Sequence, residues 1–341
     1  MNYGKLHKKS ELNIGIRILR NLLSFMVVID HFYNKQKLKP YLYILYYHIP
    51  CFFFLSFFFT YRTFISLNID KIKLRFERLL IPYFSWNFLS WIIRNIYYYM
   101  MKRKCDHSLI DFIKTLINGH IFNVVLWFQN ILILLTLIFL IIIFLFKSYH
   151  LIIFQLLFFT SYILQYSGAN YIFFKNNFAI HSRLTLGRFF EAIPHSITGM
   201  YLSRVNVMKY ITKKKMKTFI QSLIILILIT KYEIFAKFNN YKYGGLRLNI
   251  GAVCIFIIFS LIPEKIFIIN LKSEILMKLT KYTGGIYFTH YLIGTGYICS
   301  SINLIKKRTI LGCMIIHLMS YIASVIGFKL LGNTKFKNLF I

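Results

Sequence analysis

Residues 126–146 read LWFQNILILLTLIFLIIIFLF, a stretch without a single charged side chain. A helix needs about 20 predominantly apolar residues to cross the hydrocarbon core of a bilayer, so this stretch is long enough to cross it unaided. Apolar runs of the same kind, such as FIQSLIILILI at 219–229, recur along the chain. The stretch and its recurrence predict helices that span a membrane.

The composition of the whole chain agrees with this prediction. Of its 341 residues, 57% are hydrophobic and 15% are charged, whereas a soluble protein carries about 25% charged residues. The predicted fold class is all-α, a polytopic integral membrane protein with about ten transmembrane helices in one bundle. We expect residues 1–341 to form a single transmembrane domain. The predicted spans are 13–33, 42–66, 79–101, 124–146, 150–166, 186–204, 217–236, 247–269, 282–301 and 308–331.

The positive charge of the chain lies in short clusters between the apolar runs. The formal net charge is +32, but the clusters do not form the continuous basic face that nucleic-acid binding requires, so we expect no nucleic-acid partner. Basic clusters beside membrane helices set topology and contact anionic lipid head groups. Most of them fall on the side that holds both termini, which we therefore expect to be cytoplasmic; the clusters at 35–39 and 102–104 fall on the other side.

The cysteines form neither a metal-binding nor a disulfide pattern. No CxxC or Cys/His spacing suggests a zinc site, and four of the five lie in apolar runs, where a thiol behaves as a small hydrophobic group. We expect no disulfide framework and no metal site. The five are Cys51, Cys105, Cys254, Cys299 and Cys313. No small-residue cleavage site follows the first apolar run, which we expect to be retained as a helix.

The first predicted helix carries an arginine and a histidine in RNLLSFMVVIDH, residues 20–31. At 100° and 1.5 Å per residue, Arg20 and His31 differ by about 20° around the helix and lie about 16 Å apart along it. Because a charge inside a membrane is costly, a face that carries both is expected to turn towards the bundle interior or a water-filled cavity. The alternative is that Arg20 extends to the cytoplasmic interface and His31 to the outer one.

A second basic motif lies at the start of the third span, in IDKIKLRFERLLIPY. Arg75 and Arg78 are three residues apart, which places both guanidinium groups on one helix face, one turn before Pro82. Arginine forks match phosphate oxygens well, so the pair is a candidate site for a phosphorylated donor on the cytoplasmic side. The alternative is a topology anchor of the kind found in any polytopic protein.

Two more segments place ionisable side chains inside predicted spans. GRFFEAIPHSITGMY (187–201) buries Glu191, with Arg188 one turn earlier as a potential ion-pair partner. KYTGGIYFTHYLIG (281–294) places His290 inside the ninth span. A lone histidine in a membrane helix is more often hydrogen-bonded to a neighbouring helix than catalytic. Glu191, Arg188 and His290 are therefore further candidates for the site.

These motifs resemble those of the membrane acyltransferase-3 family over nearly the whole chain. RNLLSFMVVIDHF (20–32) resembles the family's first-helix signature, in which ten residues separate an arginine from a histidine. RFERLLIPYFSW (75–86) is similar to the family's Arg-rich segment, and HIPCFFFLSFFFTYR (48–62) to its Phe-rich second helix, although Phe57 stands where glycine is usual. Weaker landmarks follow in the family's order at LWF (126–128), PHSITGMYL (194–202) and YTGGIYFTH (282–290).

The resemblance implies a bacterial plasma-membrane enzyme that transfers an acetyl group from acetyl-CoA to a hydroxyl of a carbohydrate or lipid-linked glycan. It implies that His31 is catalytic with Arg20 as its partner on the helix, that Arg75 and Arg78 contact the coenzyme A phosphates, and that no cofactor is permanently bound. His31 would either deprotonate the acceptor hydroxyl or carry the acyl group transiently, and either role requires a neutral imidazole.

A polysaccharide exporter with the same fold is the alternative function, because some relatives are thought to export polysaccharide instead of acetylating it. An exporter has no need of a phosphate-binding pair on the cytoplasmic side. The complete set of Arg20, His31, Arg75 and Arg78 therefore favours the enzyme.

Overall fold

Every regular element in the described part of the chain is a helix, in agreement with the all-α prediction. The structure is a computed structural model that describes residues 14–33, 46–100, 108–118, 125–166, 180–205, 207–236, 245–262, 281–294, 309–331 and 334. The helices are α1 (Ile14–Phe32), α3 (His48–Ile65), α4 (Ile69–Met100), α5 (Leu109–Asn118), α6 (Leu126–Leu145), α7 (His150–Tyr166), α9 (Ile180–Arg204), α10 (Val207–Ile211), α11 (Lys215–Ala236), α12 (Leu246–Leu261), α15 (Thr283–Leu292) and α17 (Ile310–Leu330).

Each predicted span overlaps one of these helices. Three of them, α3, α6 and α17, are long and apolar enough to cross a membrane by length and composition. The total of about ten crossings stays a prediction. Two helices were not predicted, α5 and α10. α10 has only 5 residues. α5 has 10 residues and is amphipathic, with an apolar face and a polar face, so it does not read as an apolar run.

Several helix boundaries differ from the prediction: α9 begins at Ile180 instead of 186, α15 ends at Leu292 instead of 301, and two further differences have identifiable reasons. α4 begins at Ile69, well before the predicted 79, so Arg75 and Arg78 lie within the helix and not ahead of it. Hydropathy did not identify the first turns of α4 as part of the helix because they contain many charged residues. α12 ends at Leu261 instead of 269, since Pro263 follows and Ile262 is already extended, as a residue before proline tends to be. The rest of that predicted span lies outside the described residues.

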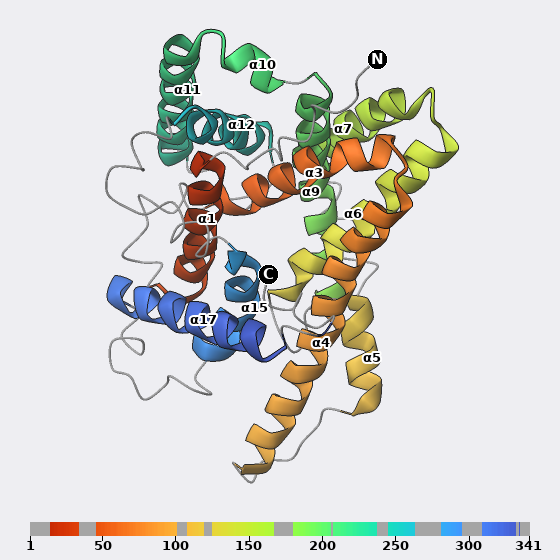
Figure 1. Cartoon of the computed structure of the whole chain (residues 1–341), viewed down its shortest axis with the longest axis vertical. Helices are drawn as coiled ribbons and strands as arrows, with labels where there is room; N and C mark the ends of the chain where they lie inside the picture. The colour runs from red at the N-terminus through yellow and green to blue at the C-terminus, as the bar shows by residue number, and fades with distance from the viewer. Residues whose placement is uncertain are drawn as a thin grey trace, which may run out of the picture.

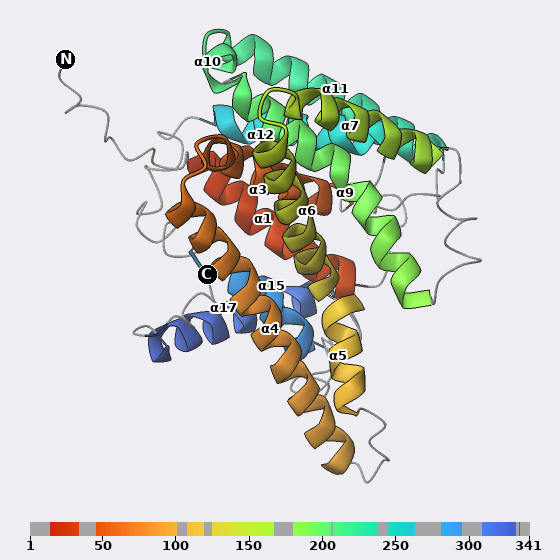
Figure 2. The same ribbon diagram turned by 90° about the vertical axis from the view of Figure 1, so that its right-hand side faces the viewer.

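The helices are distributed along the whole length of the molecule (Figure 1). Figure 1 shows α10, α11 and α12 at one end and the far part of α4, with α5 alongside it, at the other. The quarter turn in Figure 2 keeps this arrangement and shows α15 and α17 close to α1. The packing of α1 against α15 and α17 brings the two ends of the sequence together.

The centre of the bundle is filled by aromatic side chains of α3 and α6. Phe53, Phe57 and Phe139 are fully buried, and the ring centroids of Phe57 and Phe139 are 5.1 Å apart in an edge-to-face arrangement. Burial of each such ring buries a large apolar area, which stabilises the fold, and edge-to-face pairing of the rings adds to this stabilisation. The second predicted helix therefore accommodates a phenylalanine at 57 by packing it into the core.

α3 and α9 form the most extensive contact between any two described helices. Gly199 of α9 lies directly on the backbone of α3, where a Cβ atom would overlap the carbonyl oxygen of Phe54. Close approach of two helix backbones at a small residue is typical of membrane helices, in which van der Waals packing drives association. Gly187, on the same helix, has open space around it, so the glycine is required only at 199.

Candidate active site

One face of α1 carries three polar side chains, Arg20, Ser24 and His31. At 100° per residue, Ser24 and His31 fall about 40° and 20° from Arg20 around the helix axis. This face points at α15 and α17, and each of the three residues meets a polar side chain there. The predicted Arg20–His31 stripe therefore faces the protein interior and not two opposite water interfaces.

The side chain of Arg20, on α1, contacts the first residue of α15. One of its guanidinium nitrogens, Nη2, donates a hydrogen bond of 3.2 Å to Oγ1 of Thr283, the first residue of that helix. Arg17 and Arg78 are close enough for their positive charges to act on Arg20. Arg20 thus belongs to a cluster of cations in which its own hydrogen-bond partner is a neutral hydroxyl.

Ser24 lies between Arg20 and His31 on α1 and contacts His317 of α17. The Ser24 Oγ and the His317 Nε2 are 3.1 Å apart. Because Ser24 donates its hydroxyl hydrogen to the carbonyl of Asn21 at 2.8 Å, its oxygen accepts from the His317 ring. His317 is therefore a hydrogen-bonded histidine of the kind expected between packed helices.

His31 and His290 lie ring against ring where α1 ends and α15 passes it. Their ring centroids are 5.4 Å apart, with the planes tilted by 36°. His31 is partly exposed, whereas His290 is fully buried. The rings of Phe32 and Tyr291 flank His31 at centroid distances of 6.3 and 6.0 Å. The structure thus joins two histidines that the sequence separates by most of its length.

Hydrogen bonding fixes which nitrogen of His290 carries the proton. Nδ1 lies 3.0 Å from the carbonyl oxygen of Ile286, and a carbonyl can only accept, so Nδ1 is the donor. Nε2 is buried and has no hydrogen-bond partner among the described residues. In the neutral ring, this nitrogen therefore presents an unused lone pair.

Arg75 is partly buried and reaches side chains of both α3 and α6. Its Nη2 donates hydrogen bonds to Oγ of Ser56 at 2.9 Å and Oγ1 of Thr136 at 3.3 Å. Its guanidinium lies 5.5 Å from the centre of the Phe57 ring. Phe57, the residue that departs from the family pattern, therefore supplies a cation–π contact to Arg75.

The arginines of the two segments form one positively charged cluster. Arg78 lies near enough for its charge to act on both Arg75 and Arg20. Within the described ranges, no carboxylate forms an ion pair with any of the three. Arg20 and Arg75 are partly buried and Arg78 is exposed. Like charges held close together repel one another, so this cluster, Arg20–Arg75–Arg78, is suited to bind an anion.

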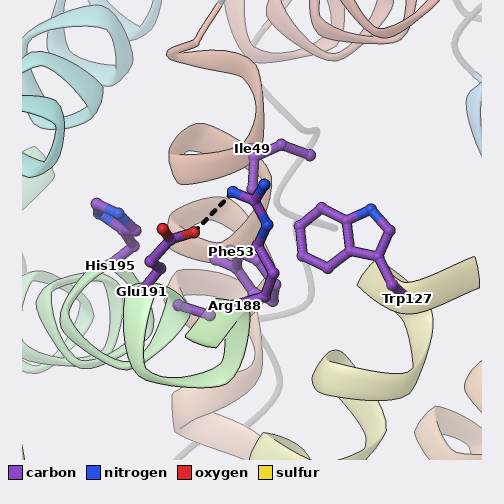
Figure 3. A pocket seen from close by; sticks show the side chains of 7 residues that line it. Ile49, Phe53, Trp127, Arg188, Glu191 and His195 are labelled. Atoms are coloured by element: carbon purple, nitrogen blue, oxygen red, sulfur yellow. Dashed lines mark hydrogen bonds and ion pairs between the residues drawn. The ribbon is translucent and has the colours of Figure 1, made fainter. Parts of the chain in front are cut away.

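Arg188 and Glu191 form a separate polar group, shown in Figure 3. Nη1 of Arg188 lies 2.8 Å from Oε2 of Glu191, which confirms the partner predicted from their spacing on α9. The guanidinium also lies 5.4 Å from the centre of the Trp127 ring. His195 stands beside Glu191 and approaches Oδ1 of Asn249 with Nδ1 at 3.3 Å.

The pocket beside this ion pair is small. It is lined by Ile49, Phe53, Trp127, Arg188, Glu191, Ala192 and His195, and it has no interior space for a water molecule. A series of ring contacts leads from it to the histidine pair: Phe53 to Phe128 at 4.5 Å, Phe128 to Tyr287 at 5.4 Å, and Tyr287 to His290 at 6.0 Å. Aromatic rings thus connect the ion pair to His290 without a polar link between them.

Several polar residues of the site carried no signal of their own in the sequence. Thr283, Ser56 and Thr136 are single hydroxyl residues within apolar segments, and their importance depends on the arginines that reach them. Only the long-range packing of α1, α3, α4, α6 and α15 reveals these contacts.

Apolar helices long enough to cross a membrane and ionisable side chains held between them define a membrane protein with an interior polar site. The model of the acyltransferase-3 family, described as an acyltransferase domain, matches residues 13–327. The chain therefore belongs to this family and is a membrane acyltransferase by its family. Comparisons with curated proteins and with solved structures gave no match.

Proposed function

We propose that the protein is an O-acetyltransferase that moves an acetyl group from acetyl-CoA to a hydroxyl of a cell-surface or capsular carbohydrate. The observation that carries the proposal is the Arg20–Arg75–Arg78 cluster, whose charge no described carboxylate neutralises and whose member Arg20 shares a face of α1 with His31. The family supports acyl transfer. The donor and the acceptor are the proposal's own additions.

In the proposed donor site, Arg75 and Arg78 bind the phosphates of coenzyme A. Guanidinium groups form paired, charge-assisted hydrogen bonds to phosphate oxygens. An incoming polyanion would also relieve the repulsion between neighbouring cations. The separation of about 16 Å between Arg20 and His31 along α1 suits a donor whose thioester lies at the far end of an extended arm from its phosphates.

His31 is the proposed catalytic residue. In one route its unprotonated nitrogen removes the acceptor's hydroxyl proton while the oxygen bonds to the acetyl carbon; the C–S bond breaks and the proton passes to the coenzyme A sulfur. In the other route the nitrogen itself bonds to the acetyl carbon as the C–S bond breaks, and the hydroxyl then displaces the histidine. Both routes begin from a neutral His31 ring.

The proposed orientation places the arginine cluster on the cytoplasmic side of a bacterial plasma membrane. Acetyl-CoA is made in the cytoplasm, so the donor reaches the cluster from that side. Both chain ends then lie in the cytoplasm, and His31 lies towards the outer leaflet, where a carbohydrate or lipid-linked glycan can approach. Reporter fusions after Lys147 and Lys215 are expected to read cytoplasmic, and a fusion near Lys104 external. An external reading at Lys215 would reverse the orientation and separate the arginines from their donor.

Mass spectrometry of surface glycans from cells that lack the protein tests the function itself. The expected result is an unchanged glycan backbone that has lost an acetyl increment, restored when the wild-type chain is expressed. Loss of the glycan from the surface, with its acetylation intact inside the cell, would show an exporter instead.

A further inference from the structure

The unpartnered nitrogen of His290 is the most unusual polar atom near the proposed catalytic centre. Buried polar atoms in folded proteins nearly always have a hydrogen-bond partner, and an exception calls for an explanation. His290 is 0% exposed, its Nδ1–H is held by the Ile286 carbonyl, and its Nε2 is left without a described partner.

Among the described residues whose rings contact His290, His31 is the one that can offer its lone pair a polar hydrogen. The other rings within contact distance are Phe32 at 6.1 Å and Tyr287 at 6.0 Å. Phenylalanine has no polar hydrogen, and the Tyr287 hydroxyl already donates to the Val125 carbonyl at 2.8 Å. The His31 ring, at 5.4 Å, carries an N–H whenever it is neutral or protonated.

We infer that His290 is a positioning residue for His31, whose N–H its Nε2 accepts during the reaction. This inference rests on the proposed function. The Ile286 carbonyl fixes the His290 tautomer so that the lone pair, and not a proton, faces the site. His290 thereby performs with a neutral ring the orienting task that a carboxylate performs beside the histidine of a serine hydrolase.

The chemistry balances in both routes. When His31 takes the acceptor's hydroxyl proton, it becomes an imidazolium; its second N–H donates to Nε2 of His290, and the new proton leaves to the coenzyme A sulfur. When His31 instead bonds to the acetyl carbon as the C–S bond breaks, its N–H stays on the ring and donates to Nε2 of His290, and the products are an acetylimidazolium and the coenzyme A thiolate. The acceptor hydroxyl then bonds to the acetyl carbon as the C–N bond breaks, and its proton passes to the thiolate, which leaves His31 neutral with its original N–H.

Replacement of His290, whose Nε2 is the proposed hydrogen-bond acceptor, tests the inference by its effect on kcat. His290→Phe keeps a ring and removes the lone pair, and we expect kcat per folded molecule to fall about 100-fold with an unchanged KM for acetyl-CoA. His290→Gln keeps a carbonyl acceptor and is expected to retain activity within about tenfold of wild type. Wild-type kcat in His290→Phe would overturn the inference.

A matched control comes from His150 of α7, a buried histidine with a neighbour for each nitrogen. Its Nδ1 lies 2.8 Å from the Lys147 carbonyl and its Nε2 3.4 Å from the Tyr61 hydroxyl. His150→Gln is expected to leave kcat unchanged. Membrane levels and thermal unfolding of every variant are measured in parallel, so that a fold defect is not read as a loss of kcat.

Nuclear magnetic resonance of ¹⁵N-histidine-labelled full-length protein in detergent tests the pair without turnover. Comparison with His290→Gln assigns the His290 signals, which are expected to show a neutral ring protonated at Nδ1. His31→Gln should shift the Nε2 signal, and His150→Gln should not. A proton on Nε2, or no shift in His31→Gln, would overturn the inference even if His31 proves catalytic. Full acetylation by His31→Gln would overturn the proposed function while leaving the histidine pair intact.

Discussion

Two groups of arginines lie inside the helical bundle, and they differ in what surrounds their charge. Arg188 faces a carboxylate of its own helix, Glu191, at 2.8 Å. Among the described residues, Arg20 and Arg75 hydrogen-bond to neutral hydroxyl groups, and Arg75 also contacts the ring of Phe57, with the charge of Arg78 close to both arginines. The first group is neutral as a whole, and the second is strongly positive.

This difference separates a structural ion pair from a site that is ready for a ligand. A negatively charged ligand next to Arg188 would be repelled by Glu191, and the adjoining pocket has no room for it. The same ligand next to Arg75 and Arg78 would meet uncompensated positive charge. Whether an arginine inside a membrane protein is structural or binds a ligand is therefore best decided by whether a carboxylate lies next to it. The following substitutions test that rule.

The largest effect is expected at the histidines that accompany the two groups. His31→Gln removes the group that takes up a proton and should lower glycan acetylation by about 10²–10⁴-fold in cells with wild-type protein levels. His195→Gln, beside the ion pair, should acetylate normally, because an amide can maintain the contact with Asn249. Acetylation by His31→Gln within a few-fold of wild type would remove the functional distinction between the groups.

Donor affinity should respond to the positive group alone. Each charged hydrogen bond is worth about 1.5–3 kcal/mol, so replacing both Arg75 and Arg78 by alanine should weaken acetyl-CoA binding more than about 100-fold. Lysine at both positions should restore affinity only in part, since a point charge does not reproduce a fork. Calorimetric titration of the purified variants measures this. Equal affinity in the double alanine variant would reduce the pair to topology anchors.

Stability should respond to the ion pair alone. Arg188→Leu leaves Glu191 without its partner, at an expected cost of about 2 kcal/mol, between the values of exposed and fully buried pairs. The partner side chains are 22% and 13% exposed, which places them between these limits. Replacing both residues by leucine should recover most of the thermal stability in detergent. A double variant less stable than Arg188→Leu would contradict a self-neutralising pair.

The smallest effect is expected where a neutral hydroxyl supports a cation. Thr283→Val removes the partner of Arg20 and should lower the free energy of unfolding by about 1 kcal/mol. Thr212→Val is the matched control, since its exposed hydroxyl bonds only to the carbonyls of its own turn, at Met208 and Lys209. Equal melting temperatures for the two variants would mean that Thr283 does not hold Arg20.

Sequence periodicity and hydropathy were sufficient to locate most of the described helices, though not α5 and α10, because these signals are local. α6 was predicted at 124–146 and found at Leu126–Leu145, and the ion pair of Arg188 and Glu191 follows from their spacing on one helix. The start of α4 was missed because its first turns are charged and mostly exposed, and the local cap in which the Asn68 side chain accepts from the Lys71 N–H leaves no trace in the hydropathy. Local patterns thus predict elements better than their ends.

The partners of the site residues could not be predicted from local patterns. Arg20 and Thr283 are 263 positions apart, and Ser24 and His317 are 293 apart. The positions of Arg20 and His31 around the axis of α1 correctly predicted that both point to the same side of the helix, towards the protein interior. Which helices they meet there depends on how the bundle packs. The roles assigned to these residues stay predictions until they are measured.

The glycine contact between α9 and α3 has a mechanical consequence. Because Gly199 rests on the Phe54 carbonyl, sliding α9 along α3 by one position would drive a side chain into a backbone. Packed helices move by small shear steps only where their surfaces allow a second arrangement. The α3–α9 contact therefore acts as a fixed frame, and any motion that admits a substrate must come from other helices packed around it.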